Sequence, residues 1–563
     1  MFNRYIINFV LLFKSIFEKF GVDPEQLRII LTIKMKMDDR RPNVYNQQRQ
    51  KKKKEVNNAS WLVMFFLGLT GLFFTFLLAS LKQPFLAHTV YFSAFMVMLA
   101  VTLISDFTNV LIDVRDNYII LPRPVSDRTF TISRILHIGI HTAKMAFAIS
   151  ISGVIYSFIG EGIFSGLVFI IEVLIATTLS IFFVNITYLI VLKITSPQRF
   201  KDFISYFQIF LSIIIFAAYY TLPRLIESSI LKGIDLTQAR ILIVVPSYWL
   251  AALHELVVNI KTTQFTTYIY AVLAVLSPII SLYLVVKVLA PGFNQKLSSI
   301  SGSGDDGVIV SSEGKGASKG FMNSIAKKVA PHPLENAGFK ITWLLSSRYR
   351  DFKVKVYPSF AYVPVYFVYF GFINKRGVSL SENWNNLLEG RMYILLMYLT
   401  GFVLTTVLQH ISMTEKYKAS WVFFTTPHNE PGRILAGMFK AVVVKYYLPY
   451  FIAIGAFSIF FWGPAVINDL ILVFMVGTLY GLLVALFQVK GFPFSQPPNN
   501  QKGGKMFITF LIMAVPAALG FLHYWAAQWE IAIWIAAAIM TIITWVSFNY
   551  YRKESWESME LAD

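Results

Sequence analysis

Long runs of apolar residues, separated by shorter polar segments, are the main pattern along this chain. A helix needs about 20 apolar residues to cross the hydrocarbon core of a bilayer. Runs of this kind predict twelve membrane spans, at residues 61–81, 90–112, 135–158, 163–192, 204–222, 265–290, 357–374, 392–412, 434–462, 467–489, 506–525 and 531–550. The pattern therefore predicts an all-α, polytopic membrane protein with about 12 transmembrane helices.

The first residues follow a different pattern. Apolar side chains at Ile6, Phe9, Phe13, Phe17 and Phe20 recur at helical spacing, and no small-residue cleavage site follows them. This spacing predicts an N-terminal amphipathic helix that lies on the membrane surface. The composition agrees with a membrane protein, because 56% of the residues are hydrophobic and only 14% are charged.

The net charge of +19 raises the possibility of nucleic-acid binding, so the positions of the basic residues matter. If both termini are cytoplasmic, most of the 50 Lys and Arg residues fall in cytoplasmic segments, as the positive-inside rule requires. We expect Lys51–Lys54 to contact anionic lipid headgroups; nucleic acid is less favoured, since no aromatic residues interleave these lysines. The sequence thus predicts a multi-pass protein of the inner (plasma) membrane with both termini cytoplasmic, and a bacterial inner membrane is the simplest setting because no eukaryotic targeting signal is evident.

A polar interval, Lys287–Val356, divides the predicted spans into six and six. Its Gly- and Ser-rich part, Ser298–Gly320, is typical of a flexible linker. The predicted organisation is an amphipathic and basic N-terminal segment (1–60), a first six-span half (61–290), a flexible cytoplasmic linker (291–356), a second six-span half (357–550) and a cytoplasmic tail (551–563).

The two halves share a short motif after their second span. NYIILPRP (Asn117–Pro124) and SWVFFTTP (Ser420–Pro427) are equally long, end in proline, and carry an aromatic residue in second place. Each pattern predicts a short interfacial helix, because a proline stops a helix and the preceding residue leaves helical geometry. A chance match is the alternative, although the equal position in each half favours a repeat.

These two segments are the predicted docking elements for a cytoplasmic partner. The residues expected to contact it are Asp113, Arg115, Asp116, Tyr118, Leu121, Pro122, Arg123 and Pro124 in the first segment, and Glu415, Lys418, Trp421, Phe424 and Pro427 in the second.

The first segment, LPRPVS followed by RTFTISRIL, resembles the loop between the second and third spans of ABC-2 type exporter permeases. In that family a coupling helix precedes a Pro-[Val/Leu/Ile]-Ser step, which Pro124-Val125-Ser126 matches, whereas Pro427-His428-Asn429 keeps only the proline. Residues 5–20 resemble the elbow helix of these permeases, and Val244–Leu256 is similar to their Pro-x-x-Trp stretch. The resemblance covers a small part of the chain.

The resemblance implies export driven by a separate ATPase, with two ATPase subunits docked on loops 113–134 and 413–433. It also implies that one polypeptide supplies both six-span units, which many such permeases supply as a dimer. ATP and Mg²⁺ would bind to the partner, because the chain has no G-x-x-x-x-G-K-[ST] motif. The expectation is a transport subunit without enzymatic activity, without catalytic residues and without a cofactor of its own.

Two further features point to positions inside or above the spans. Lys144 and Glu172 fall at similar predicted depths in neighbouring antiparallel spans, and a charged residue inside a membrane is a functional candidate. They predict an ion pair, either structural or in contact with substrate. Pro246 and Trp249 lie in the long outer region 222–264, which predicts an outer gate or, equally, an inert packing loop.

No metal site is predicted from the sequence. His137 and His141 have permissible ligand spacing, but no third ligand lies near them and Lys144 on the same face would repel a cation. His254-Glu255 lacks the second histidine of a H-E-x-x-H motif. The absence of cysteine excludes thiolate ligands and disulfides.

Two other classes of protein fit the same pattern of spans. A major-facilitator-like secondary transporter also has twelve spans in two halves, but its loop after the second span usually contains glycines, which residues 113–134 lack. A membrane scaffold without transport activity is the other alternative. Recovery of an ATPase subunit with the protein would separate these classes.

Overall fold

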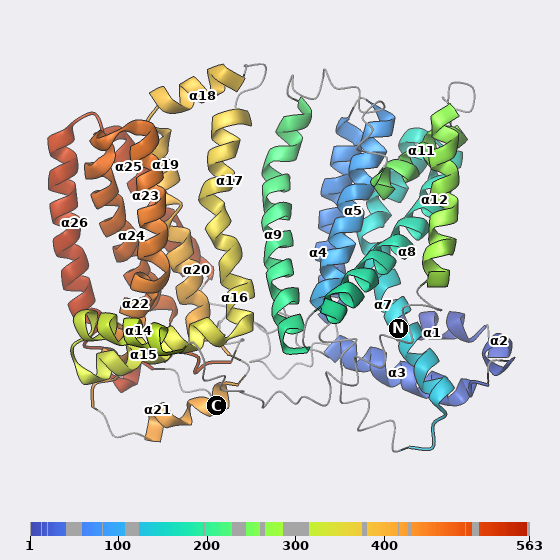
Figure 1. The fold of residues 1–563 in the computed structure, drawn as a ribbon, viewed down its shortest axis with the longest axis horizontal. Helices are drawn as coiled ribbons and strands as arrows, with labels where there is room; N and C mark the ends of the chain where they lie inside the picture. The colour runs from blue at the N-terminus through green and yellow to red at the C-terminus, as the bar shows by residue number, and fades with distance from the viewer. Residues whose placement is uncertain are drawn as a thin grey trace. The chain divides into compact units, whose positions relative to one another are not determined.

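The computed structural model is helical throughout its described part, with 89% of residues in helices and no strand. It describes residues 2–12, 14–19, 21–40, 59–81, 83–106, 123–194, 197–227, 244–258, 265–284, 315–373, 380–414, 416–425, 429–489, 491–497 and 506–559. The all-α prediction is therefore confirmed. Figure 1 shows long helices together with shorter ones in both the earlier and the later part of the chain.

The helices in the first part of the chain are α1 (Phe2–Leu11), α2 (Lys14–Lys19), α3 (Pro24–Arg40), α4 (Ala59–Ser80), α5 (Pro84–Asp106), α7 (Asp127–Tyr156), the π-helix η3 (Ser157–Glu161), α8 (Ile163–Ile194), α9 (Pro197–Glu227), α11 (Pro246–Val258) and α12 (Phe265–Leu284).

The later helices begin with α14 (Lys315–Val329), α15 (Pro333–Arg348), α16 (Arg350–Val356), η6 (Tyr357–Ala361), α17 (Tyr362–Val368), η7 (Tyr369–Ile373), α18 (Leu380–Glu389), α19 (Met392–Tyr398), α20 (Gly401–Ile411), η8 (Tyr417–Trp421) and α21 (Val422–Thr425). They continue with α22 (Pro431–Val442), η9 (Val443–Tyr447), α23 (Leu448–Trp462), η10 (Pro464–Val466), α24 (Ile467–Gln488), α25 (Met506–Ala526), α26 (Glu530–Tyr551) and η12 (Trp556–Ser558).

Seven of the described helical segments are long and apolar enough to cross a membrane. They are Pro84–Ile104, Leu136–Glu161, Ile163–Tyr188, Met392–Ile411, Pro431–Trp462, Pro464–Gln488 and Glu530–Tyr551. Shorter apolar helices occupy Met64–Ser80, Ser205–Ala218 and Phe265–Ser281. The described residues of each predicted span are thus largely helical, whereas twelve crossings in two repeats stay a prediction.

The long helices keep large apolar side chains on their outer surfaces. Phe76, Leu174, Phe460 and Trp545 are each more than half exposed. Apolar atoms are common on soluble proteins too, but rows of them along helices of spanning length fit contact with lipid chains. The chain is accordingly a membrane-embedded protein.

The chain divides into two compact units. Unit 1 comprises Met1–Asn46, Lys53–Ile204 and Gly233–Val308, and unit 2 comprises Gln47–Lys52, Ser205–Lys232 and Ile309–Asp563. The division differs from the predicted halves at α9, where the residues from Ser205 onward belong to unit 2. Side-chain contacts account for this difference: Arg350 donates to Ser205 Oγ, and Phe216 packs on Tyr362 with ring centroids 4.8 Å apart.

The N-terminal helices of unit 1 pack against the beginning of α7. Val22, Leu27 and Leu31 form a buried cluster with Ile140 of α7. The backbone N–H of Asp23 donates to Thr129 Oγ1 at 3.1 Å. The predicted amphipathic lead is therefore helical, and its continuation, α3, is fixed to α7.

The core of unit 1 is aromatic and tightly packed. Tyr91, Phe92 and Phe169 are fully buried between α5 and α8. Helices α4 and α7 approach so closely that a Cβ atom at Gly71 would overlap the carbonyl group of Ile149. Glycine at this position thus permits the helix contact.

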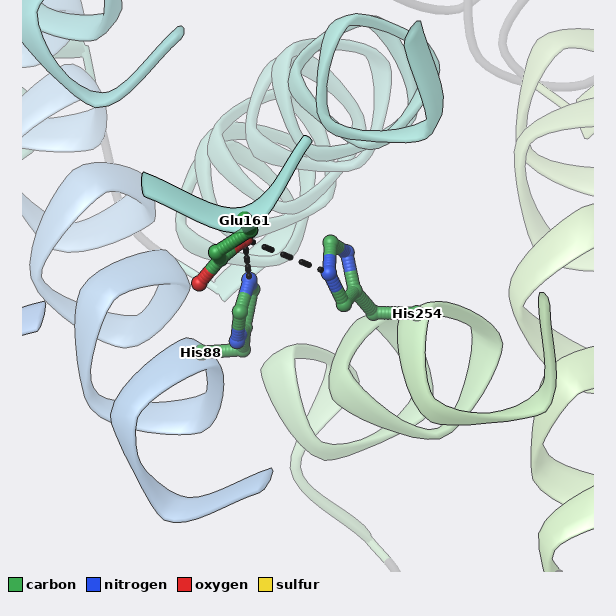
Figure 2. A group of neighbouring side chains, drawn as sticks. All are labelled: His88, Glu161 and His254. Atoms are coloured by element: carbon green, nitrogen blue, oxygen red, sulfur yellow. Dashed lines mark ion pairs between the residues drawn. The ribbon is translucent and has the colours of Figure 1, made fainter. Parts of the chain in front are cut away.

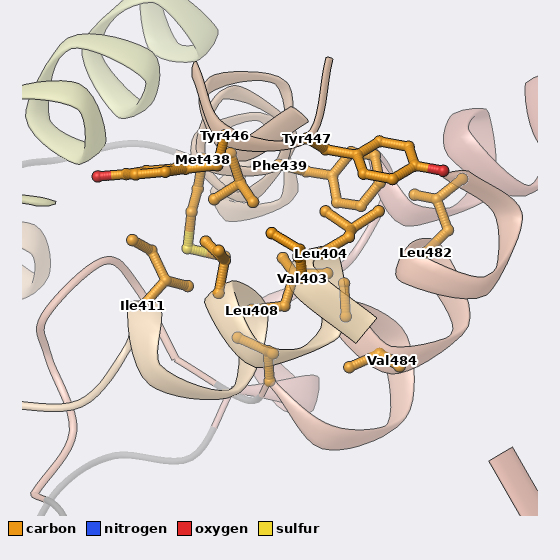
Figure 3. Packing of buried hydrophobic residues seen from close by; sticks show 14 of the residues in the cluster. Val403, Leu404, Leu408, Ile411, Met438, Phe439, Tyr446, Tyr447, Leu482 and Val484 are labelled. Atoms are coloured by element: carbon orange, nitrogen blue, oxygen red, sulfur yellow. The ribbon is translucent and has the colours of Figure 1, made fainter. Parts of the chain in front are cut away.

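The core of unit 2 lies between α20, α22 and α24. Figure 3 shows Val403, Leu404 and Leu408 of α20 facing Met438 and Tyr447. The π-helix η9 interrupts the segment from α22 to α23 and begins after Val442, so the predicted span 434–462 is a composite helix.

The predicted flexible linker, 291–356, is helical in its described part. Helices α14 to α16 cover most of residues 315–356, and Ala326 and Phe339 are fully buried there. Gly338 of α15 and Gly437 of α22 leave room for close backbone contact between these two helices. Lys440 reinforces the contact by donating to Glu335 Oε2 at 2.6 Å. This tertiary contact, which local composition does not reveal, explains the difference from the prediction.

Candidate functional site: a buried histidine and carboxylate cluster

Three polar side chains from separate parts of unit 1 converge at one end of its helix bundle. Figure 2 shows His88 of α5, Glu161 of η3 and His254 of α11 facing one another. The Nε2 atoms of His88 and His254 lie 3.6 and 3.5 Å from Glu161 Oε2. We call these three residues the His-Glu-His cluster.

Glu161 reaches this position because α7 ends in an unusual way. The last turn is the π-helix η3, and it stops at Gly162, whose φ of 110° suits glycine. Two hydroxyl groups then donate to the carboxylate: Ser157 at 2.9 Å and Ser165 at 2.7 Å from Oε2. The turn and the two serines together hold the Glu161 carboxylate against the histidines.

His88 is held in a defined orientation by the first turn of α5. Its Nδ1 lies 3.0 Å from the carbonyl oxygen of Pro84. A carbonyl can only accept, so Nδ1 carries a proton that it donates. In the neutral ring, Nε2 then presents a lone pair towards Glu161. The residue is 1% exposed, and Nε2 has no hydrogen-bond partner in the described part of the chain.

His254 is oriented by the carboxylate of Glu172 on α8. Its Nδ1 lies 3.2 Å from Glu172 Oε2, and its Nε2 lies 3.0 Å from Ser165 Oγ. Glu172 is fully buried, and His254 is a partner of its carboxylate that the sequence analysis did not foresee; the predicted pairing of Glu172 with Lys144 stays a prediction. His254 reaches Glu172 because α11 folds into the bundle and packs against α8 and α5.

The cluster contains more hydrogen-bond acceptors than donors. The acceptors are the Glu161 carboxylate and the two Nε2 atoms of the neutral histidines, and the donors are hydroxyl groups of Ser157 and Ser165. Ser165 has a single hydroxyl proton, and in the described geometry it serves Glu161. With both rings neutral, the two Nε2 atoms would then face a carboxylate with only lone pairs between them. The imidazole rings are also stacked, 3.8 Å apart between centroids, which disfavours a positive charge on both. The arrangement therefore suits a single positive charge, carried either by one protonated ring or by a cation that the three side chains share.

The predicted outer gate falls on the same helix as His254. Pro246 begins α11, and the partly buried Trp249 packs against the core of unit 1. Ser247 adds a contact to α5 through Ser93, with 2.6 Å between the two Oγ atoms. α11 is thus a packed helix, and whether it opens stays a prediction.

The first predicted docking segment lies mostly outside the described residues. This applies to Asp113, Arg115, Asp116, Tyr118, Leu121 and Pro122. Arg123 and Pro124 are described and are exposed just before α7. Ser126 forms the N-cap of α7 and accepts a hydrogen bond from the backbone of Thr129 at 3.2 Å.

The second predicted docking segment is a short, partly anchored helix. Glu415 and Pro427 lie outside the described residues, while Lys418 and Trp421 lie in η8 and Phe424 in α21.

One face of this segment is buried and another is exposed. Phe423 stacks on Phe492 with centroids 5.0 Å apart. Trp421 and Val422, by contrast, are 64% and 48% exposed. Figure 1 shows α21 set apart from the long helices of unit 2.

Unit 2 also contains a buried carboxylate and histidine pair. His523 Nε2 of α25 lies 2.9 Å from Asp469 Oδ1 of α24, and the Tyr393 hydroxyl donates to Asp469 Oδ2 at 2.8 Å. This pair uses both carboxylate oxygens. It has no third converging ligand among the described residues.

Sequence reasoning missed the His-Glu-His cluster. Its three members are far apart along the chain. His254 was compared only with the local H-E-x-x-H motif, which it does not complete. The signals that could have found it are the Glu161-Gly162 break between two spans and a histidine near the start of the second span. No known protein family, curated protein or solved structure matches the chain.

Proposed function

We propose that this chain is the membrane-spanning permease subunit of an ABC-type exporter. ATP would be hydrolysed by a separate nucleotide-binding chain, docked in two copies on loops 113–134 and 413–433. The observation that carries the proposal is the η8–α21 segment, which exposes Trp421 and Val422 between two long helices of unit 2.

The position and anchoring of this segment suit the transmission of force. Phe423 and Phe424 both pack near Phe492, at centroid distances of 5.0 and 5.8 Å. A push on Trp421 would therefore reach the ends of α20 and α22 directly, because η8–α21 connects them. Exposed tryptophan is also a common anchor in protein interfaces.

The described end of the first loop supports the same proposal. α3 packs on α7, and Gln26 of α3 donates to the Pro124 carbonyl at 3.3 Å. α3 follows residues 5–20, the segment that resembles an elbow helix, so this contact links the N-terminal helices to the predicted docking loop. Cytoplasmic termini and a bacterial inner membrane are part of this proposal.

The test is purification of the full chain from its native membrane, without cross-linking. We expect a chain with a Walker A motif to copurify in stoichiometric amount and to hydrolyse ATP. The Trp421→Asp variant should lose most of this chain, because a buried interface does not tolerate an unpaired charge. Trp421→Phe should retain it.

The matched control is Lys553→Ala, which changes an exposed residue at the end of α26. It should leave copurification unchanged, and all variants should reach the membrane at similar levels. Recovery of an ATPase that is equal in Trp421→Asp and wild type would remove the role of this segment. The absence of any ATPase, together with transport that depends on a proton gradient, would overturn the proposal.

A secondary transporter is the second candidate, and the buried cluster of unit 1 favours it. Glu172 is fully buried within hydrogen-bonding distance of His254, and carriers use such intramembrane acids for proton coupling. Under this alternative, Glu172→Gln would abolish gradient-driven uptake or efflux while leaving protein levels unchanged. Under the exporter proposal, transport would instead require ATP.

A further inference from the structure

We propose that His88, Glu161 and His254 form a binding site for a divalent transition-metal ion, with Zn²⁺ as the best fit. The ligand atoms are Nε2 of each histidine and Oε2 of the glutamate, all within 4.8 Å of one another. This inference does not rest on the proposed transport function.

The distances agree with the geometry of a zinc site. Two ligands bound about 2.1 Å from a tetrahedral ion lie about 3.4 Å apart. The two Nε2 atoms lie 3.6 and 3.5 Å from Glu161 Oε2, so an ion would need little rearrangement. Two histidines and one glutamate, with a fourth position left for water or a hydroxyl group, form a common ligand set for zinc.

The surrounding groups orient both imidazole rings for metal binding. A histidine ligand usually donates its second N–H to a carbonyl or a carboxylate, which fixes the tautomer. The Pro84 carbonyl receives Nδ1–H of His88, and Glu172 receives Nδ1–H of His254. Both Nε2 atoms are thereby left to face the Glu161 carboxylate.

The burial of the cluster supports a bound cation. His88 is 1% exposed and its Nε2 has no hydrogen-bond partner in the described structure, although a buried polar atom normally has one. The side chain of Glu161 is 24% exposed, which leaves a path for an ion. The nitrogen ligands favour Zn²⁺ and its neighbours over Mg²⁺ or Ca²⁺, which prefer oxygen.

A bound ion would connect three separate segments of unit 1. It would join the beginning of α5, the π-turn η3 and the middle of α11 by direct bonds. Because α11 carries the predicted gate residues Pro246 and Trp249, the ion would hold this helix in the packed position. A structural clamp on α11 is the expected role.

The first experiment measures metal binding by the full chain, purified without a histidine tag and treated with a chelator. Zn²⁺ is added, weakly bound ions are removed, and bound metal is counted by mass spectrometry. Wild type should retain about one ion per chain in a site of this type, and Mg²⁺ should not compete. The His88→Gln/His254→Gln variant should retain none.

Two further variants separate direct ligands from supporting groups. Glu172→Gln should keep the site but weaken Zn²⁺ binding by about 10–100-fold, as loss of an orienting partner does elsewhere. His523→Gln removes an equally buried histidine from unit 2 and should leave binding unchanged. Hydrogen exchange should also slow in α11 on addition of Zn²⁺, in wild type but not in the double variant.

A spectroscopic measurement covers the case in which the double variant does not fold. Co²⁺ added to wild-type protein should give the strong visible bands of a four-coordinate site, and Zn²⁺ should displace them. X-ray absorption should show two imidazole ligands. Wild-type protein that binds no Zn²⁺, or a folded double variant that binds it equally well, would overturn the proposal, as would Co²⁺ spectra identical to those of the free ion.

Discussion

The pair between Glu172 and His254 allows a quantitative test of the bundle interior. His254→Ala would leave the fully buried Glu172 carboxylate without its partner at 3.2 Å. Removing one member of a buried ion pair costs about 3–5 kcal/mol. In the metal-free protein, where His254 carries a proton on both nitrogens, the direct attraction of unit charges at this distance is about 5 kcal/mol at an effective dielectric constant of about 20, which agrees with that range.

A second substitution should partly reverse this loss. Glu172→Gln removes the stranded charge, so the double variant should be more stable than His254→Ala alone by about 1–3 kcal/mol, the usual coupling for residues in contact. Glu172→Gln by itself should cost only about 1–2 kcal/mol, because the amide can still accept a hydrogen bond.

The assay is unfolding of purified protein by SDS in mixed micelles, followed by tryptophan fluorescence. A chelator is present in every sample, so that metal binding does not contribute to stability. The reasoning would be refuted if the two substitutions simply added, making the double variant the least stable of the three. In that case the contact would carry no appreciable coupling.

Two other predictions use the same unfolding assay. Gly71→Ala should lose about 1–3 kcal/mol by overpacking, because its Cβ would overlap the Ile149 carbonyl, whereas Gly68→Ala on the same helix meets ordinary contacts and should be neutral or gain up to about 1 kcal/mol of helix propensity; equal losses would contradict this. Lys440→Met should cost about 3 kcal/mol, since it leaves a buried carboxylate short of one partner: the Glu335 side chain is only 2% exposed. Lys440→Arg should cost less, and the reverse order would contradict the ion-pair argument.

The predicted spans agree with the helices because lipid imposes a local requirement. A segment surrounded by hydrocarbon must satisfy its backbone hydrogen bonds internally and carry apolar side chains, so each span is visible in its own residues. The predicted ranges 163–192 and 467–489 thus differ little from α8 (Ile163–Ile194) and α24 (Ile467–Gln488). The apolar pattern does not determine how many helices cross the membrane, since the shorter apolar helices also have apolar side chains and internal backbone hydrogen bonds.

The helices in the predicted linker could not be predicted from apolar runs. α15 has no long apolar run, and its stability comes from contacts with α22, a neighbour distant in sequence. Gly338, Gly437 and the ion pair of Lys440 with Glu335 make that contact possible. The composition of a segment indicates its average preference for helix or loop, whereas packing against a neighbouring helix such as α22 decides whether the segment folds.

The His-Glu-His cluster could not be predicted from the sequence for a related reason. Each member lies near a helix end or on a short helix, and only the folding of α11 against α5 and α8 brings them together. The sequence marked Glu172 as an intramembrane charge, and depth along the predicted spans suggested Lys144 as its partner but gave no sign of His254. Depth alone cannot identify a partner, because it leaves the lateral order of helices open.

Units 1 and 2 each contain a buried carboxylate and histidine pair, but only the pair in unit 1 adjoins the proposed metal site. Asp469 uses one oxygen for His523 and the other for the Tyr393 hydroxyl. That arrangement satisfies the carboxylate with protons that its neighbours already carry, although Nδ1 of His523 has no hydrogen-bond partner among the described residues. In unit 1, Glu172 orients His254, and the remaining lone pairs of the two histidines still meet a second carboxylate. The additional acidic group is the difference, and it gives unit 1 the three converging ligand atoms on which the metal proposal rests.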